Sequence, residues 1–131
     1  MIIDSSAIVA MVHREAEADL FIRTIGESSA PGMSTATFLE TAIVVDSRRD
    51  PVSSRTLDQI CKDAKIRFVP VDEAQMHIAR QAYRDFGKGS GHPARLNFGD
   101  CFAYALAKAM DEPLLYKGTD FSHTDVRPAL P

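Results

Sequence analysis

The sequence lacks several features that would place a protein in a large functional class. Its apolar runs fall short of the roughly 18 residues that a membrane-spanning helix needs, and its start has neither the basic stretch nor the small-residue cleavage site of a signal peptide. Only two cysteines are present, and no C-x-x-C spacing joins them. We therefore expect a cytoplasmic protein with no membrane contact, in which Cys61 and Cys101 are free, buried thiols.

Catalytic and phosphate-binding motifs of several common enzymes are also missing. No serine lies in a G-x-S-x-G pattern, and the four histidines are scattered, so a hydrolase triad is not favoured. No histidine-cysteine spacing suggests zinc. The glycine-rich segment 87–91 follows a predicted helix and does not match the P-loop pattern, so we expect residues 87–95 to form a flexible, basic loop that faces the substrate. The net charge of -3 argues against a protein that coats nucleic acid through bulk charge.

What is present is the composition of an ordinary globular protein, with 45% apolar and 25% charged residues in a chain of 131. This length predicts a single domain over residues 1–131. Apolar periodicity, caps and breakers predict the elements. We expect strands at 1–4, 33–34, 66–71 and 113–116 with a last edge strand at 125–127, and helices at 7–12, 15–25, 35–47, from Pro51, after Asp72 and at 97–110.

Helices separate the predicted strands, which favours parallel pairing with right-handed crossovers. The predicted fold class is α/β, a three-layer sandwich around a central, mainly parallel sheet of four to five strands. Ligands of such sheets bind beyond the carboxyl ends of the strands. Asp4 and Asp120 both fall at such ends.

Two more acids, on predicted helices, lack the basic neighbours that solvated helical acids usually have. Glu40 has alanine, threonine, isoleucine and valine at the positions three and four residues away, which favours a functional role. Asp100 has leucine, asparagine, alanine and tyrosine there. A purely structural account also exists for Asp100, as the partner of Asn97 in a capping box. Asp4 is equally open to interpretation as a helix cap and Asp120 as a turn residue.

Taken together, the four acids form a set that could converge on one pocket. Carboxylates brought together repel one another, and divalent cations neutralise that repulsion. Ligands that are all oxygen favour Mg²⁺, with Mn²⁺ as a substitute, over zinc. The sequence therefore predicts a magnesium site formed by Asp4, Glu40, Asp100 and Asp120.

Four stretches resemble, in order and spacing, the motifs of PIN-domain ribonucleases and most closely the VapC toxins of bacterial toxin-antitoxin pairs. They are Ile2–Ser6, Phe38–Glu40, Asn97–Ala107 and Tyr116–Phe121. The resemblance spans the whole chain, and the G-D-C-F-A-Y-A-L-A run followed by G-x-D-F carries most of its specificity.

This resemblance implies an active site of three invariant acids and a fourth, more variable one, at Asp4, Glu40, Asp100 and Asp120. Ser5 or Ser6, and Thr119, match positions where the family places a hydroxyl near the metal or the scissile phosphate. The family commonly has asparagine at the position of Thr119. The resemblance also implies an RNA substrate, a homodimer and a cognate antitoxin that inserts a basic side chain into the acidic pocket.

The expected reaction is metal-assisted, in-line attack of water on an RNA phosphodiester, which leaves a 5′-phosphate and a 3′-hydroxyl. Asp4 and Asp100 are the expected direct metal ligands, and Glu40 and Asp120 bind the metal directly or through water. Seven basic residues are candidates for phosphate contacts: Arg48, Arg49, Arg55, Arg80, Arg84, Lys88 and Arg95.

Two other doubly wound classes compete with this interpretation. A receiver-like signalling module is also acidic at its strand ends, but it begins with adjacent acids and has no use for an apolar-flanked Glu40. A haloacid-dehalogenase-like phosphohydrolase would use Asp4 as its nucleophile, but it needs a second aspartate two residues later, where this chain has Ser6. A degenerate interaction module is a third alternative, although it would not need all four acids.

Overall fold

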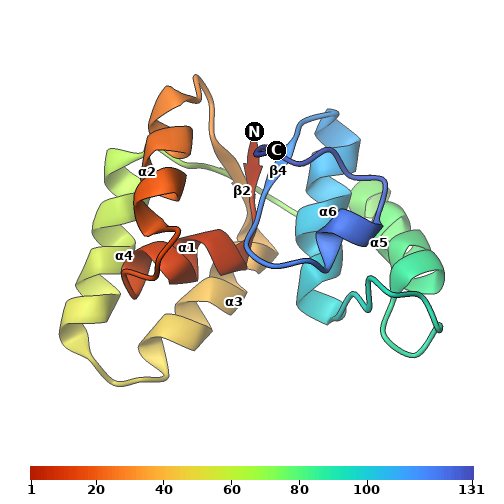
Figure 1. The fold of residues 1–131 in the computed structure, drawn as a ribbon, viewed down its shortest axis with the longest axis horizontal. Helices are drawn as coiled ribbons and strands as arrows, with labels where there is room; N and C mark the ends of the chain where they lie inside the picture. Colours follow the sequence, from red (N-terminus) through yellow and green to blue (C-terminus); the bar gives the residue numbers. More distant parts are fainter.

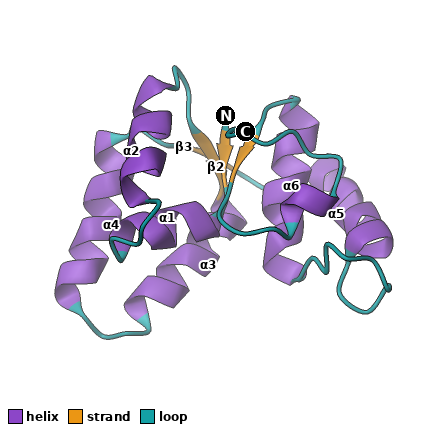
Figure 2. Ribbon diagram, in the orientation of Figure 1, coloured by secondary structure: helices purple, strands orange, loops and turns teal.

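A four-stranded, fully parallel sheet lies at the centre of the computed structural model, which describes all 131 residues. Its strands are β1 (Ile2–Ile3), β2 (Gly32–Ser34), β3 (Arg67–Val69) and β4 (Leu114–Leu115). The strand order is β3-β2-β1-β4 (Figures 1 and 2). The predicted α/β class with a parallel central sheet is confirmed, and the number of strands is four.

Six α-helices surround the sheet, and five of them begin at a residue whose side chain accepts a hydrogen bond from the first turn. Such caps satisfy backbone N–H groups that would otherwise have no partner, so they set where each helix begins. None of the helices has the length and apolar character needed to cross a membrane. The helices are α1 (Ser5–Val12), α2 (Ala18–Glu27), α3 (Thr35–Asp46), α4 (Pro51–Asp63), α5 (Glu73–Phe86) and α6 (Phe98–Met110).

The helices form the two outer layers of a sandwich. In Figure 1, α1, α2 and α4 lie on one side of the strands, and α5 and α6 lie on the other. Helix α3 starts directly after β2 and packs against α1, α4 and α6, so it connects the two sides at the carboxyl ends of the strands. That position brings a helical acid close to acids that follow strands.

Adjacent residues of β1 divide the interior into two cores, because successive side chains of a strand point to opposite faces. Ile3 packs in the cluster that involves α1, α2 and α4, together with Leu115. Ile2 packs in the cluster on the α5 and α6 side, together with Leu114. The sheet is therefore buried on both faces, as parallel sheets require.

The prediction of a fifth strand at 125–127 is wrong. Leu114 donates to the carbonyl of Arg127 and accepts from Ala129, but this contact is an isolated bridge at Pro128. Proline has no N–H to extend a ladder, which explains why pairing stops there. Strand β3 is also shorter than the predicted 66–71 and ends before Pro70, and α2 begins three residues later than predicted, at Ala18.

Candidate active site

The strand order creates a topological switch point between β1 and β4. From β1 the chain crosses to β2 on one side, and β4 later pairs with the other side of β1. Asp4 follows β1 directly, and the loop 117–120 follows β4. Open α/β sheets bind ligands in the crevice at such a point. The fold therefore brings two of the four predicted acids to the place where a ligand would bind.

Asp4 is the most buried of these acids, with 2% of its surface exposed. Its Oδ2 accepts hydrogen bonds from the backbone N–H of Ser6 at 3.0 Å and from the Ser6 hydroxyl at 2.6 Å. Its Oδ1 is buried without any partner. Burial raises the pKa of Asp4, the two bonds from Ser6 oppose that rise, and the charge of Glu40 adds to it. Asp4 is thus both the cap of α1 and a carboxylate with one free, desolvated oxygen.

Ser6 links the end of β1 to the loop after β4. Its hydroxyl donates to Asp4 and accepts from the backbone N–H of Lys117 at 2.9 Å. The Lys117 ammonium pairs with Glu15 and, at 3.1 Å, with Glu17, so this loop is also held against the segment between α1 and α2. The Ser5 hydroxyl makes no hydrogen bond, so only Ser6 forms this link, and the expected role of either hydroxyl near a metal or phosphate stays a prediction.

Asp100 has the capping role that the sequence left open, and its role in an active site stays a prediction. Its Oδ2 accepts from the Asn97 N–H at 2.9 Å, and Asn97 accepts from the Asp100 N–H at 2.9 Å, which completes a capping box at the start of α6. The pKa of Asp100 is raised to about 6, mainly by burial; the bond from Asn97 opposes the rise, and the charges of Asp4, Asp120 and Glu40 contribute to it. The capping box therefore does not separate Asp100 from the other three acids, since all three act on it.

Glu40 extends from α3 across the start of α6. A Cβ atom built on Gly99 would lie only 1.7 Å from the Glu40 Oε2 atom, so the carboxylate rests against the Gly99 backbone beside Asp100. Its charge contributes to the raised pKa of both Asp4 and Asp100. The Glu40 carboxylate is therefore near enough to Asp4 and Asp100 for its charge to act on both.

Asp120 and Thr119 lie at the outer rim of this edge, and both are exposed. Asp120 precedes a short 3-10 helix, η1 (Phe121–His123), and makes no side-chain cap. Its charge raises the pKa of Asp100, which is the observation that connects it to the other acids. The Thr119 carbonyl accepts from the Ser122 N–H, but no hydrogen bond of the Thr119 hydroxyl supports the predicted role.

The donor set fits a divalent cation in its chemistry. All four candidate ligands are carboxylates, as Mg²⁺ prefers, and the free Oδ1 of Asp4 offers an oxygen that nothing else in the protein satisfies. No three His, Cys, Asp or Glu side chains are grouped closely enough to form a ready-made metal site. Mutual repulsion of like charges favours such separation.

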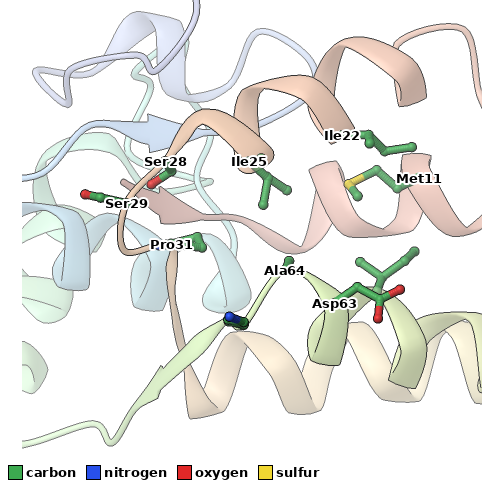
Figure 3. Close-up of a pocket in the computed structure, with 11 residues that line it drawn as sticks. Met11, Ile22, Ile25, Ser28, Ser29, Pro31, Asp63 and Ala64 are labelled. Atoms are coloured by element: carbon green, nitrogen blue, oxygen red, sulfur yellow. The ribbon is translucent and has the colours of Figure 1, made fainter.

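Of the four acids, only Glu40 lines one of the main hollows of the surface. One of about 440 Å³ is lined by Glu40, Gly99 and apolar residues of α3 and α6. Another of about 520 Å³ lies between the ends of α2 and α4, where Met11 and Ile25 face Ala64 (Figure 3), and it contains none of the four acids. The four acids thus share none of these main hollows, which is consistent with an open edge that a polymer can cross.

The seven basic residues predicted for phosphate contacts are all exposed, and none forms an ion pair within the chain. Two of them, Arg80 and Lys88, line a hollow of about 550 Å³ together with Asn97, the cap of α6. These two cations are therefore free, and they lie near the turn of α6 that carries Asp100.

Comparison with known sequences decides the family. The PIN domain family matches residues 1–127. A VapC ribonuclease of Mycobacterium bovis and ribonuclease VapC28 of Mycobacterium tuberculosis are each 51% identical to the chain over 130 residues, which cover 99% of this chain and 98% of those proteins. The chain belongs to the VapC ribonuclease family of PIN-domain proteins. The predicted resemblance is confirmed, and neither the receiver-like nor the dehalogenase-like interpretation applies.

Two solved structures of toxin proteins have the same fold. Mycobacterium tuberculosis VapC20, described as a toxin that cleaves the sarcin-ricin loop, superposes with a TM-score of 0.70 at 16% identity, over 97% of this chain and 98% of that one. A toxin-antitoxin complex from Klebsiella pneumoniae gives a TM-score of 0.69 at 13% identity, over 92% of this chain and 89% of that one. At these identities the likeness establishes the shared fold, and it agrees with the VapC family assignment.

Two residues of this VapC protein have roles that the sequence motifs do not reveal. Lys117 lies in a loop, and its N–H and its ammonium both hold that loop in place. Gly99 lies in a motif of α6, and its lack of a side chain makes room for Glu40. A glycine in the first turn of a helix, directly before a candidate ligand, is the signal that could have identified it, because helices disfavour glycine.

The raised pKa of Asp100 predicts a stability difference that depends on pH. Asp100 titrates near 3.8 when unfolded and at about 6 when folded. Between these values the folded protein holds the proton more strongly, so the free energy of unfolding falls as the pH rises. In EDTA, Asp100→Asn should be more stable than the parent at neutral pH by about 1 kcal/mol, after allowance for solvent screening, and equal to it near pH 4. Urea unfolding across this range measures the difference, with Asp58→Asn as an exposed control; a constant difference would contradict the prediction.

The bridge through Ser6 predicts unequal effects for two neighbouring serines. Ser6→Ala leaves the Lys117 N–H without its acceptor and removes one donor from Asp4, so it should lower the free energy of unfolding by about 1 kcal/mol. Ser5→Ala removes a hydroxyl that makes no hydrogen bond and should change stability far less. Denaturant unfolding of both variants tests this. Equal effects of the two substitutions would show that the bridge does not hold the loop.

Proposed function

We propose that this chain is a metal-dependent endoribonuclease that hydrolyses RNA phosphodiester bonds at the carboxyl edge of its sheet. Asp4, Glu40, Asp100 and Asp120 are its active-site acids. One observation carries the proposal: the charges of the other three acids all act on Asp100 and raise its pKa. Carboxylates that repel one another weaken the fold unless they bind a cation, so their assembly supports a metal-binding role.

The acids of the proposed site have different tasks. Asp4 and Asp100 are the first ligands for Mg²⁺ or Mn²⁺, because both are held by hydrogen bonds and partly or fully desolvated. Glu40 and Asp120 complete the acidic edge, as ligands or through water, and Ser6 fixes the orientation of Asp4. The metal, when bound, would activate the attacking water and stabilise charge on the leaving oxygen. The products would be a 5′-phosphate and a 3′-hydroxyl.

The surface around the acids is consistent with a nucleic-acid substrate. RNA is held largely through its phosphates, so free cations next to a cleavage site support this assignment. Arg80 and Lys88 meet this requirement beside α6, and Arg48, Arg49, Arg55, Arg84 and Arg95 are further exposed candidates without ion pairs. An open acidic edge with cations nearby fits an extended polymer better than a small phosphomonoester.

In the cell we propose that the protein is the toxin of a toxin-antitoxin pair in the cytoplasm, with one PIN domain over residues 1–131. Its relatives are named VapC ribonucleases, and one structural neighbour is a toxin-antitoxin complex. A cognate antitoxin would place a basic side chain among the acids and so neutralise the charges that act on Asp100. A homodimer is the second proposed assembly.

Cleavage of RNA by the purified protein tests the activity. The parent should cut total RNA with Mg²⁺ or Mn²⁺ and not with EDTA. Asp4→Asn, Glu40→Gln and Asp100→Asn should each reduce the rate on the order of 100-fold or more, because each removes a charged ligand while keeping the side-chain shape. Asp58→Asn is the matched control and should cut like the parent. A folded Asp100→Asn protein that cuts at the parental rate would refute the site assignment.

Light scattering tests the proposed homodimer. Helix α3 exposes three apolar side chains within about one helical turn, namely Leu39, Ile43 and Val44. Ile43 is 60% exposed. Apolar patches of this kind mark interaction surfaces. The parent should have twice the mass of one chain, and Ile43→Glu should convert it to the monomer, whereas Leu20→Glu on α2 should leave the dimer intact. A monomeric parent at high concentration would contradict this.

A further inference from the structure

Glu40 is held differently from Asp4 and Asp100, whose carboxylates accept hydrogen bonds. Asp4 accepts two hydrogen bonds from Ser6, and Asp100 accepts one from Asn97. No hydrogen bond or ion pair fixes the Glu40 carboxylate, and Glu40 is only half-buried on α3. Steric fit against its neighbours is therefore what determines where this carboxylate lies.

The neighbour that decides this fit is Gly99. It is buried in the first turn of α6. Its neighbours in the chain are Phe98, which is exposed, and Asp100, which is half-buried. A Cβ atom at this position would lie 1.7 Å from Oε2, 2.5 Å from Cδ and 2.8 Å from Oε1 of Glu40. All three distances are far below van der Waals contact. The whole carboxylate thus occupies the volume that any side chain at position 99 would fill.

We propose that Gly99 is a positioning residue for the acidic site: its missing side chain allows the Glu40 carboxylate to lie across the first turn of α6, beside Asp100. This inference rests on the proposed nuclease function. Any other residue at position 99 turns Glu40 away from Asp4 and Asp100 and removes its charge from the metal-binding edge.

Alanine at position 99 is a selective probe of this arrangement. The atoms that its methyl group meets belong to the end of a flexible side chain, which can rotate toward solvent without moving any backbone. Alanine also favours a helix more than glycine does. Gly99→Ala should therefore keep or raise the melting temperature. If Gly99 served only to pack the structure, the same substitution would lower the melting temperature.

Mn²⁺ binding to the metal-free protein, measured by titration calorimetry, is the main readout. Gly99→Ala should weaken Mn²⁺ binding by about 10–100-fold, the range typical for loss of a group that orients a metal site, and slow RNA cleavage in parallel. Gly26→Ala is the matched control, because Gly26 also lies in a helix, α2, and an added Cβ there meets nothing within 4 Å. It should bind Mn²⁺ and cut RNA like the parent.

A double-mutant cycle shows whether Gly99 acts through Glu40. In a Glu40→Ala background no carboxylate remains to be displaced, so adding Gly99→Ala should cause no further loss of Mn²⁺ affinity. An equal loss in both backgrounds would overturn the proposal, because the methyl group would then act on something else. Unchanged Mn²⁺ affinity of Gly99→Ala in the parental background would also overturn it.

The two proposals fail in different ways in this experiment. A parent that binds Mn²⁺ but does not cut RNA would refute the nuclease function, and the Mn²⁺ titrations would still decide the role of Gly99. A parent that cuts RNA, with a Gly99→Ala variant that matches it in both readouts, would refute the role of Gly99 alone. A parent that binds no Mn²⁺ would refute both.

Discussion

Repulsion between carboxylates at one edge of the sheet is the constraint on which the rest of this structure depends. Asp4 is almost fully buried and Asp100 partly so, and each has a raised pKa because burial and neighbouring charges disfavour its ionised form. A fold selected only for stability would not keep such a group of acids. The stability needed to hold them comes from the two apolar cores that Ile2 and Ile3 separate, one on each face of the sheet.

The chain limits this repulsion by giving the acids local structural roles. Asp4 caps α1 and Asp100 completes the capping box of α6, so each carboxylate lies at a helix N-terminus, where the partial positive charge of the helix favours an anion. A position at a helix N-terminus also places both acids at the carboxyl edge of the sheet, because helices of a parallel α/β fold start there. Asp4 and Asp100 can therefore each cap a helix and take part in the proposed site.

Much of the fold could be predicted because its signals are local. Helix starts follow from Asp4, Asp50, Asp72 and Asn97, whose side chains cap the turn directly after them. Apart from the start of α2, the errors lie at the margins of the sheet, where pairing depends on distant partners. The segment 125–127 was predicted as a strand, but its only backbone contact with the sheet is to Leu114, and pairing stops at Pro128. The short β3 has one neighbour, β2, so its sequence alone did not show that pairing ends at Val69.

The sequence by itself determined which acids lack partners, since Glu40 and Asp100 have no basic neighbour within one helical turn, and it determined the family through the order of its motifs. Only the tertiary structure decided how these acids meet. The Ser6 bridge to Lys117 and the fit of Glu40 against Gly99 join residues 111 and 59 positions apart, and no local propensity contains them. Contacts of this kind exist because the sheet order places β1 beside β4 and α3 beside α6.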